Sequence, residues 1–132
     1  MIDVRIQAAD FDPGRQIERL GALNCGALAS FTGLAVADDE VESIHVDHYP
    51  ALAKSVLTRL SEEAELSWSL CGVILIHRHG TLAPGDRIAF AGVAARDQDD
   101  ALAAIAFLAE ALRWDAPFWR KELLAGGGSR WR

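Results

Sequence analysis

The sequence predicts a single α+β domain with about three helices. The chain has 132 residues, which is enough for one hydrophobic core and too few for two ordinary domains. Hydrophobic residues make up 51% of the chain and charged residues 24%, a balance that indicates a globular protein and not a disordered one. Strand-like and helix-like segments follow one another without the regular alternation of a doubly wound sheet, so we expect the α+β class.

The first third of the chain predicts a strand, a short helix and a second strand. Residues 2–6 alternate apolar and polar side chains, as a strand does. Asp12 is a typical helix cap and Pro13 a typical first helical residue, so a helix is expected to begin there. Residues 25–33 are apolar and mostly small, which predicts a buried strand that ends near Gly33. The helix presents three apolar residues on one face, namely Ile17, Leu20 and Leu23.

The central segment predicts a strand followed by an amphipathic helix. Residues 41–49 alternate strictly, but His45 falls on one face and His48 on the other, so this strand has no clearly dry side. Pro50 then opens a helix that extends to about residue 66. Its apolar positions recur at helical spacing and are Leu52, Val56, Leu60 and Ala64.

The last third predicts two further strands and a long helix. Residues 70–77 and 86–95 read as strands that pair in a hairpin-like unit, with a Pro-Gly turn between them. Three aspartates within residues 97–100 favour a helix N-terminus, because acidic groups complement the helix dipole there. The helix that follows is expected to end before Pro117, since the residue before a proline disfavours the helical region.

The charge distribution indicates a local anion site on an acidic body. The net charge is −6, which argues against nucleic acid as the main partner. Residues 1–112 hold 8 Lys/Arg and 17 Asp/Glu, or −9, whereas residues 113–132 hold 5 and 2, or +3. A solvated basic tail is the alternative interpretation. The apolar runs are too short to span a membrane and the N-terminus lacks a signal-peptide pattern, so a cytoplasmic protein is expected.

The cysteines and histidines do not predict a metal site. Cys25 and Cys71 are expected to be reduced core thiols in a reducing compartment, with a disulfide between them as the alternative. No carboxylate or thiolate stands at ligand spacing from the four histidines, so no metal and no cofactor are predicted. We expect His77 to be a hydrogen-bonded residue at the end of a strand.

The segment Phe118-Trp119-Arg120-Lys121 combines two aromatic residues with two cations. One interpretation is structural, with the aromatic rings closing a sheet edge while the cations point to water. The other is a pocket wall, at which cations converge on a phosphate-bearing ligand and an aromatic ring stacks on it. The cations in question are Arg113, Arg120, Lys121 and Arg130.

Several motifs, in order along the chain, resemble the large, catalytic subunit of molybdopterin synthase. They are ALASFTG (27–33), HVDHYP (45–50), VILIHRHGTLAPGD (73–86), IAFAGVAA (88–95), DAPFWRKE (115–122) and RW (130–131). The resemblance implies a single hammerhead-type α+β domain with a mixed, largely antiparallel sheet. This domain is expected to cover residues 1–125, followed by a short, flexible, Gly-rich basic tail over residues 126–132.

The resemblance also implies a function in molybdenum cofactor biosynthesis. The family is a transferase that moves sulfur from the C-terminal thiocarboxylate of a small ubiquitin-like subunit, ending in Gly-Gly, to cyclic pyranopterin monophosphate. Homodimers of the large subunit bind two small subunits in a heterotetramer. By this resemblance the catalytic residues are Arg113, Arg120 and Lys121, and the substrate-binding residues are Arg78, Arg96, Phe118 and Arg130.

This chain departs from the family at functional positions. The family has lysine where this chain has Arg113 and Arg120, and arginine cannot accept a proton at neutral pH. Lys121 can replace the second lysine only if the backbone turns it inward, because neighbours in an extended segment point to opposite sides. The family also has a basic residue three positions after the FTG motif, whereas this chain has apolar residues there, followed by the acidic residues 38–40. The alternative function is therefore a catalytically impaired binding or dimerisation module, and a pterin- or nucleotide-phosphate binder outside this pathway is a third.

Overall fold

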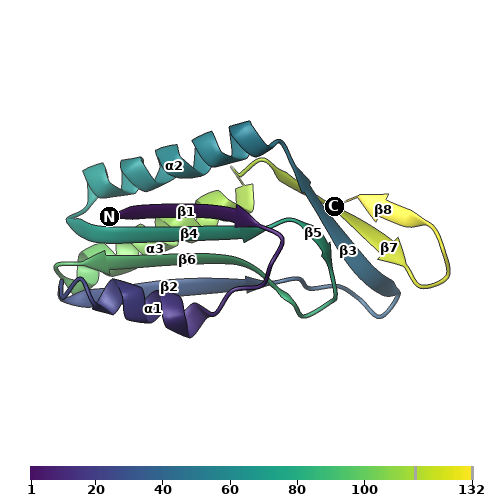
Figure 1. Ribbon diagram of the computed structural model, residues 1–132, viewed down its shortest axis with the longest axis horizontal. Helices are drawn as coiled ribbons and strands as arrows, with labels where there is room; N and C mark the ends of the chain where they lie inside the picture. The colour runs from purple at the N-terminus through teal and green to yellow at the C-terminus, as the bar shows by residue number, and fades with distance from the viewer. Residues whose placement is uncertain (115, 132) are drawn as a thin grey trace.

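The computed structural model describes residues 1–114 and 116–131, and it confirms an α+β domain (Figure 1). The elements in chain order are β1 (Ile2–Gln7), α1 (Pro13–Gly21), β2 (Ala27–Leu34), β3 (Val41–His48), α2 (Pro50–Ser67), β4 (Leu70–Arg78), β5 (Gly80–Leu82), β6 (Arg87–Ala95), α3 (Gln98–Trp114), β7 (Phe118–Leu124) and β8 (Ser129–Trp131).

The described strands form two four-stranded sheets. The first has the order β1-β4-β6-β2, in which β1 and β4 are parallel and the other pairs antiparallel. The second has the order β5-β3-β7-β8 and is antiparallel throughout. In Figure 1 the second sheet extends from the end of the first at which β4 finishes. The expected mixed, largely antiparallel arrangement is confirmed.

Helices cover both faces of the first sheet. Successive residues of β4 point to opposite faces, so Val73 and Leu75 join the larger core cluster while Ile74 and Ile76 join the smaller one. The larger cluster lies beneath α2 and α3, and the smaller one beneath α1. A strand buried on both faces explains why residues 70–77 read as a continuous apolar run.

Two expectations about strand burial are wrong. None of the β2 side chains is fully buried, because β2 is an edge strand and pairs only with β6 among the described strands. Conversely, β3 has a dry face, on which Ile44 and Val46 are each only 1% exposed. A register shift between Val41 and Ser43 brings Val41 into the core as well. A bulge of this kind changes the alternation, and sequence spacing does not reveal it.

The helix boundaries follow the predicted signals, but one apolar face differs. The Asp12 carboxylate accepts hydrogen bonds from the backbone of Gly14 at 2.9 Å, as expected for a cap before Pro13. Leu20 is fully buried, whereas Ile17 is 38% exposed. Two further predicted apolar-face residues are also exposed, Leu23 at 37% and Leu52 at 51%. In α3, the Asp97 carboxylate accepts a hydrogen bond from the backbone of Asp100 at 2.8 Å and caps the helix.

The expected C-terminal tail continues the second sheet. Residues 129–131 form β8, which pairs with β7 in a hairpin. Gly127 and Gly128 have φ angles of 90° and 88°, which glycine adopts without strain, so the Gly-rich segment makes the turn.

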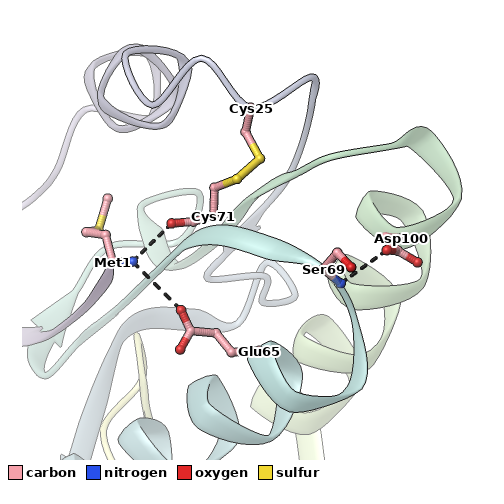
Figure 2. The surroundings of a disulfide bond; sticks show 6 residues. All are labelled: Met1, Cys25, Glu65, Ser69, Cys71 and Asp100. Atoms are coloured by element: carbon pink, nitrogen blue, oxygen red, sulfur yellow. Dashed lines mark hydrogen bonds and ion pairs between the residues drawn. A yellow bond between two sulfur atoms is a disulfide. The ribbon is translucent and has the colours of Figure 1, made fainter.

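Cys25 and Cys71 form a disulfide with their Cα atoms 6.2 Å apart, so the expectation of two reduced core thiols is wrong (Figure 2). That expectation depended on the compartment, whereas the fold brings the loop after α1 against the start of β4, within the distance that a disulfide bridges. The Met1 amino group donates to the Cys71 carbonyl at 3.0 Å and lies 3.7 Å from the Glu65 carboxylate. The N-terminus is thus held at the same end of the sheet.

No described helix has the length and apolar character needed to cross a membrane.

Candidate functional site

A cavity of about 910 Å³ opens where the ends of β2 and β4 meet the start of β6, the end of α3 and the start of β7. Its apolar lining includes Phe31, Leu34 and Ile88. The charged groups come from the C-terminal part of the chain, because α3 ends at this edge of the first sheet and β7 begins there. The charged and imidazole-bearing residues that line it are His77, Glu110, Arg113 and Arg120.

Two arginines give the cavity its anion-binding character. Arg113 lies in the last turn of α3, and its guanidinium carbon is 4.6 Å from the centre of the Trp114 ring. Arg120 is the third residue of β7 and lines the same cavity. Glu110 is the one carboxylate among the described lining residues, so the lining carries a net positive charge. Guanidinium groups bind phosphate and carboxylate in a fork-like geometry, which suits this cavity to an anionic ligand.

A stack of rings borders the cavity, and two of its members, His77 and Phe118, belong to the cavity lining. The His77 and Phe118 rings lie 3.6 Å apart between centroids and only 9° from parallel. The His48 ring lies 5.5 Å from the Phe118 ring, and the His79 ring lies 4.7 Å from that of His48. The stack joins β3, β4 and β7, so it fixes the start of the second sheet against the end of the first. Phe118 therefore has a defined position at the cavity wall.

His77 is held in one tautomer and is neutral. Its Nδ1 lies 2.8 Å from the Arg78 carbonyl oxygen, which can only accept, so Nδ1 carries the proton and Nε2 carries a lone pair. Burial, together with the smaller effect of the nearby positive charge of Arg120, lowers the pKa of His77 to about 4, although the hydrogen bond to the Arg78 carbonyl acts in the opposite direction. The predicted hydrogen-bonded strand-end residue is confirmed, and the structure also places it in the cavity lining.

Arg113, Phe118 and Arg120, all predicted site residues, come together in this cavity. The predicted catalytic Lys121 lies on the other face of β7, with its amino nitrogen 5.4 Å from the centre of the Trp131 ring. Because β7 is extended, consecutive side chains point to opposite faces, and Lys121 does not share the cavity that Arg120 lines.

The other predicted substrate-binding arginines make contacts elsewhere in the chain. Arg130 forms an ion pair at 2.7 Å with the buried Glu122 and a second ion pair with Asp38, and these hydrogen bonds raise its pKa. Asp38 belongs to the acidic segment 38–40 that departs from the family pattern, and in this structure its carboxylate pairs with Arg130.

Arg78 and Arg96 also lie outside the cavity lining. The Arg78 guanidinium donates to the carbonyl oxygens of Ala8 and Arg87, with a distance of 3.0 Å in each case. Arg96 is exposed and directly precedes α3, and its backbone N–H donates to the Ser69 carbonyl near the start of β4. This is the opposite end of the first sheet from the cavity.

Sequence reasoning did not include His77 and Glu110 in the site. His77 lies two residues after Leu75 in β4, so its side chain is on the same face of the strand as Val73 and Leu75. That spacing indicated the side of the sheet covered by α2 and α3. Glu110 precedes Arg113 by three residues on α3, a spacing that places both near one helix face.

Within the described residues, no group of three or more His, Cys, Asp or Glu side chains is arranged to hold a metal ion.

The fold and the cavity together define an α+β protein with an arginine-lined cavity that is suited to an anionic ligand. The chain belongs to the MoaE protein family, whose sequence model matches residues 6–114.

The chain is similar over nearly its whole length to curated members of this family. It is 38% identical over 128 residues to the molybdopterin synthase catalytic subunit of Cereibacter sphaeroides, covering 94% of this chain and 87% of that protein. It is 37% identical over 134 residues to the corresponding subunit of Pseudomonas aeruginosa, covering 97% and 88%. Among solved structures, a molybdopterin biosynthesis MoaE protein from Burkholderia ambifaria superposes with a TM-score of 0.85 at 36% identity, covering 99% of this chain and 88% of that one.

Proposed function

We propose that this protein is the large, sulfur-transferring subunit of a molybdopterin synthase and acts in molybdenum cofactor biosynthesis. The observation that carries the proposal is the cavity lined by Arg113 and Arg120 in a chain of the MoaE family. Its substrate is cyclic pyranopterin monophosphate, which carries a phosphate for the guanidinium groups and a planar ring system. The cavity volume of about 910 Å³ lies in the range of small-molecule sites.

The sulfur donor in this proposal is the C-terminal thiocarboxylate of a small ubiquitin-like subunit. A thiocarboxylate is an anion, and after sulfur transfer the carrier leaves as a carboxylate, so the two arginines complement the donor as well as the phosphate. The large subunit forms a homodimer that binds two small subunits, and the heterotetramer works in the cytoplasm without a bound cofactor.

A non-catalytic binding module is the second candidate, and one observation favours it. The described lining of the cavity contains no lysine, and Lys121 lies on the opposite face of β7. Arginine keeps the positive charge but cannot exchange a proton at neutral pH. In this alternative the chain binds the small subunit and forms no product.

The test is reconstitution from the purified protein, thiocarboxylated small subunit and cyclic pyranopterin monophosphate, with molybdopterin as the readout. We expect product from the wild type, a rate loss of about 10²-fold in Arg113→Ala and Arg120→Ala because each removes a charge from the cavity, and no large loss in Arg120→Lys. Lys121→Ala is the matched control on the same strand, and it should turn over like the wild type.

Two results would change the conclusion. Tight binding of the small subunit with no molybdopterin from the wild type would establish the binding module in place of the enzyme. Loss of activity in Lys121→Ala, with the fold and the small-subunit affinity intact, would return Lys121 to the mechanism and require β7 to rotate in the complex. Thermal melts of all variants separate these outcomes from unfolding.

A further inference from the structure

The cavity contains cations that bind anions, but these cations cannot take up a proton. Sulfur that passes from an acyl carbon to a substrate carbon is joined to both for a time, and water must then cleave the acyl–sulfur bond. Water is a weak nucleophile unless a base removes its proton as it attacks. Arg113 and Arg120 stay protonated at any working pH, so they cannot serve as that base.

His77 has the geometry that this role requires. Its ring lies against Phe118, and its Nδ1 proton is held by the Arg78 carbonyl at 2.8 Å. The lone pair of Nε2 is therefore on the part of the ring that the backbone hydrogen bond does not use. His77 lines the same cavity as Arg113 and Arg120, so the imidazole ring and the two arginines border one space.

We propose that His77 is the proton acceptor of this site and activates the water that releases sulfur from its carrier. The inference rests on the proposed function. In the step, the water oxygen bonds to the acyl carbon, the carbon–sulfur bond breaks, and the sulfur remains on the substrate as a thiolate. One water proton passes to Nε2, and the other stays on the new carboxylic acid of the carrier, which then ionises in solvent. The imidazolium returns its proton to solvent when the products leave.

The charges around His77 make the transfer dependent on bound ligand. Burial is the main effect that disfavours an imidazolium at His77 in the empty cavity, and the charges of Arg120 on β7 and of His48 and His79 add to it. Arg113 and Glu110 on α3 line the same space. A phosphate and a carboxylate bound to the two arginines offset the positive charge and favour proton uptake. The imidazole is thus kept neutral and ready to accept until both anions are in place.

The experiment compares the wild type with His77→Gln in single-turnover reactions with the thiocarboxylated small subunit. Glutamine retains a hydrogen-bond acceptor but cannot take a proton. We expect small-subunit binding to be unchanged and sulfur release to slow by about 10²- to 10⁴-fold, the usual contribution of a general base. The carrier–substrate thioester should accumulate and be visible by mass spectrometry.

A second variant separates base chemistry from packing. In His77→Ala, added imidazoles should restore the rate in proportion to their neutral form, and more basic imidazoles should restore it more. A structural role predicts rescue by size alone, independent of basicity, and that result would overturn the proposal. Wild-type turnover by His77→Gln would overturn it while leaving the proposed function intact. A wild type that makes no molybdopterin would instead refute the proposed function, and the His77 role with it.

Discussion

Breaking the disulfide should cost this protein a large part of its stability. Cys25 and Cys71 are 46 residues apart in sequence, and the bond closes that loop in the unfolded chain. The loop-closure entropy for this separation corresponds to about 4 kcal/mol at 25 °C. For a domain of this size we expect the melting temperature of Cys25→Ala/Cys71→Ala to fall by roughly 15 °C.

The assay is thermal and urea unfolding followed by circular dichroism, with and without reductant. In reductant the wild type should unfold like the double variant, because both then lack the cross-link. Comparing the wild type with and without reductant leaves both cysteine side chains in place, so it isolates the effect of the cross-link on the free energy of unfolding. In the absence of reductant, native wild-type protein should show no thiol that reacts with a thiol reagent.

Two results would refute the reasoning. Wild-type stability that does not respond to reductant would mean that the bond does not constrain the chain. Two reactive thiols in protein purified without reductant would mean that the cysteines are not joined. The disulfide and the cavity lie at opposite ends of β4. At a temperature where both proteins are folded, the oxidised wild type and the double variant should therefore bind the small subunit with similar affinity.

Two further predictions concern packing and pH. A Cβ atom at Gly92 would lie 2.7 Å from Leu20 Cδ1 and 2.8 Å from the Phe90 ring, so Gly92→Ala should destabilise the protein by about 1–3 kcal/mol in urea unfolding. Gly126→Ala meets open space and is the control, and equal effects of the two would contradict the packing argument. The pKa of His77 is lowered from 6.5 to about 4, so between these pH values the unfolded chain binds a proton that the folded chain does not. The free energy of unfolding should fall by about 3 kcal/mol as pH drops through that window, and His77→Phe should make the dependence shallower. A slope unchanged in His77→Phe would exclude His77 as the cause.

The site was partly visible in the sequence. The excess of positive charge after residue 112 indicated an anion site, and Arg113 and Arg120 do line the cavity. Of the four cations for which convergence was one interpretation, Lys121 and Arg130 do not line the cavity. An extended strand sends Lys121 to the face opposite Arg120, and Arg130 is held by the carboxylates of Glu122 and Asp38.

The sequence by itself determined the local elements, since caps, prolines and apolar periodicity act within a few residues of one another. Asp12 and Pro13 start α1, the aspartates around residue 99 start α3, and the continuous apolar run of β4 is readable directly. Together with the family motifs, these features were enough for the α+β class and the family.

Only the tertiary structure decided which strand lies at an edge, which cysteines meet and which side chains share the cavity. These outcomes depend on pairing between segments far apart in the chain, such as the loop at Cys25 with the start of β4. His77 shows the difference most clearly. Its position in a strand could be predicted from its neighbours, but its neutral state, fixed tautomer and contact with Phe118 follow from burial between elements that are brought together only when the chain folds.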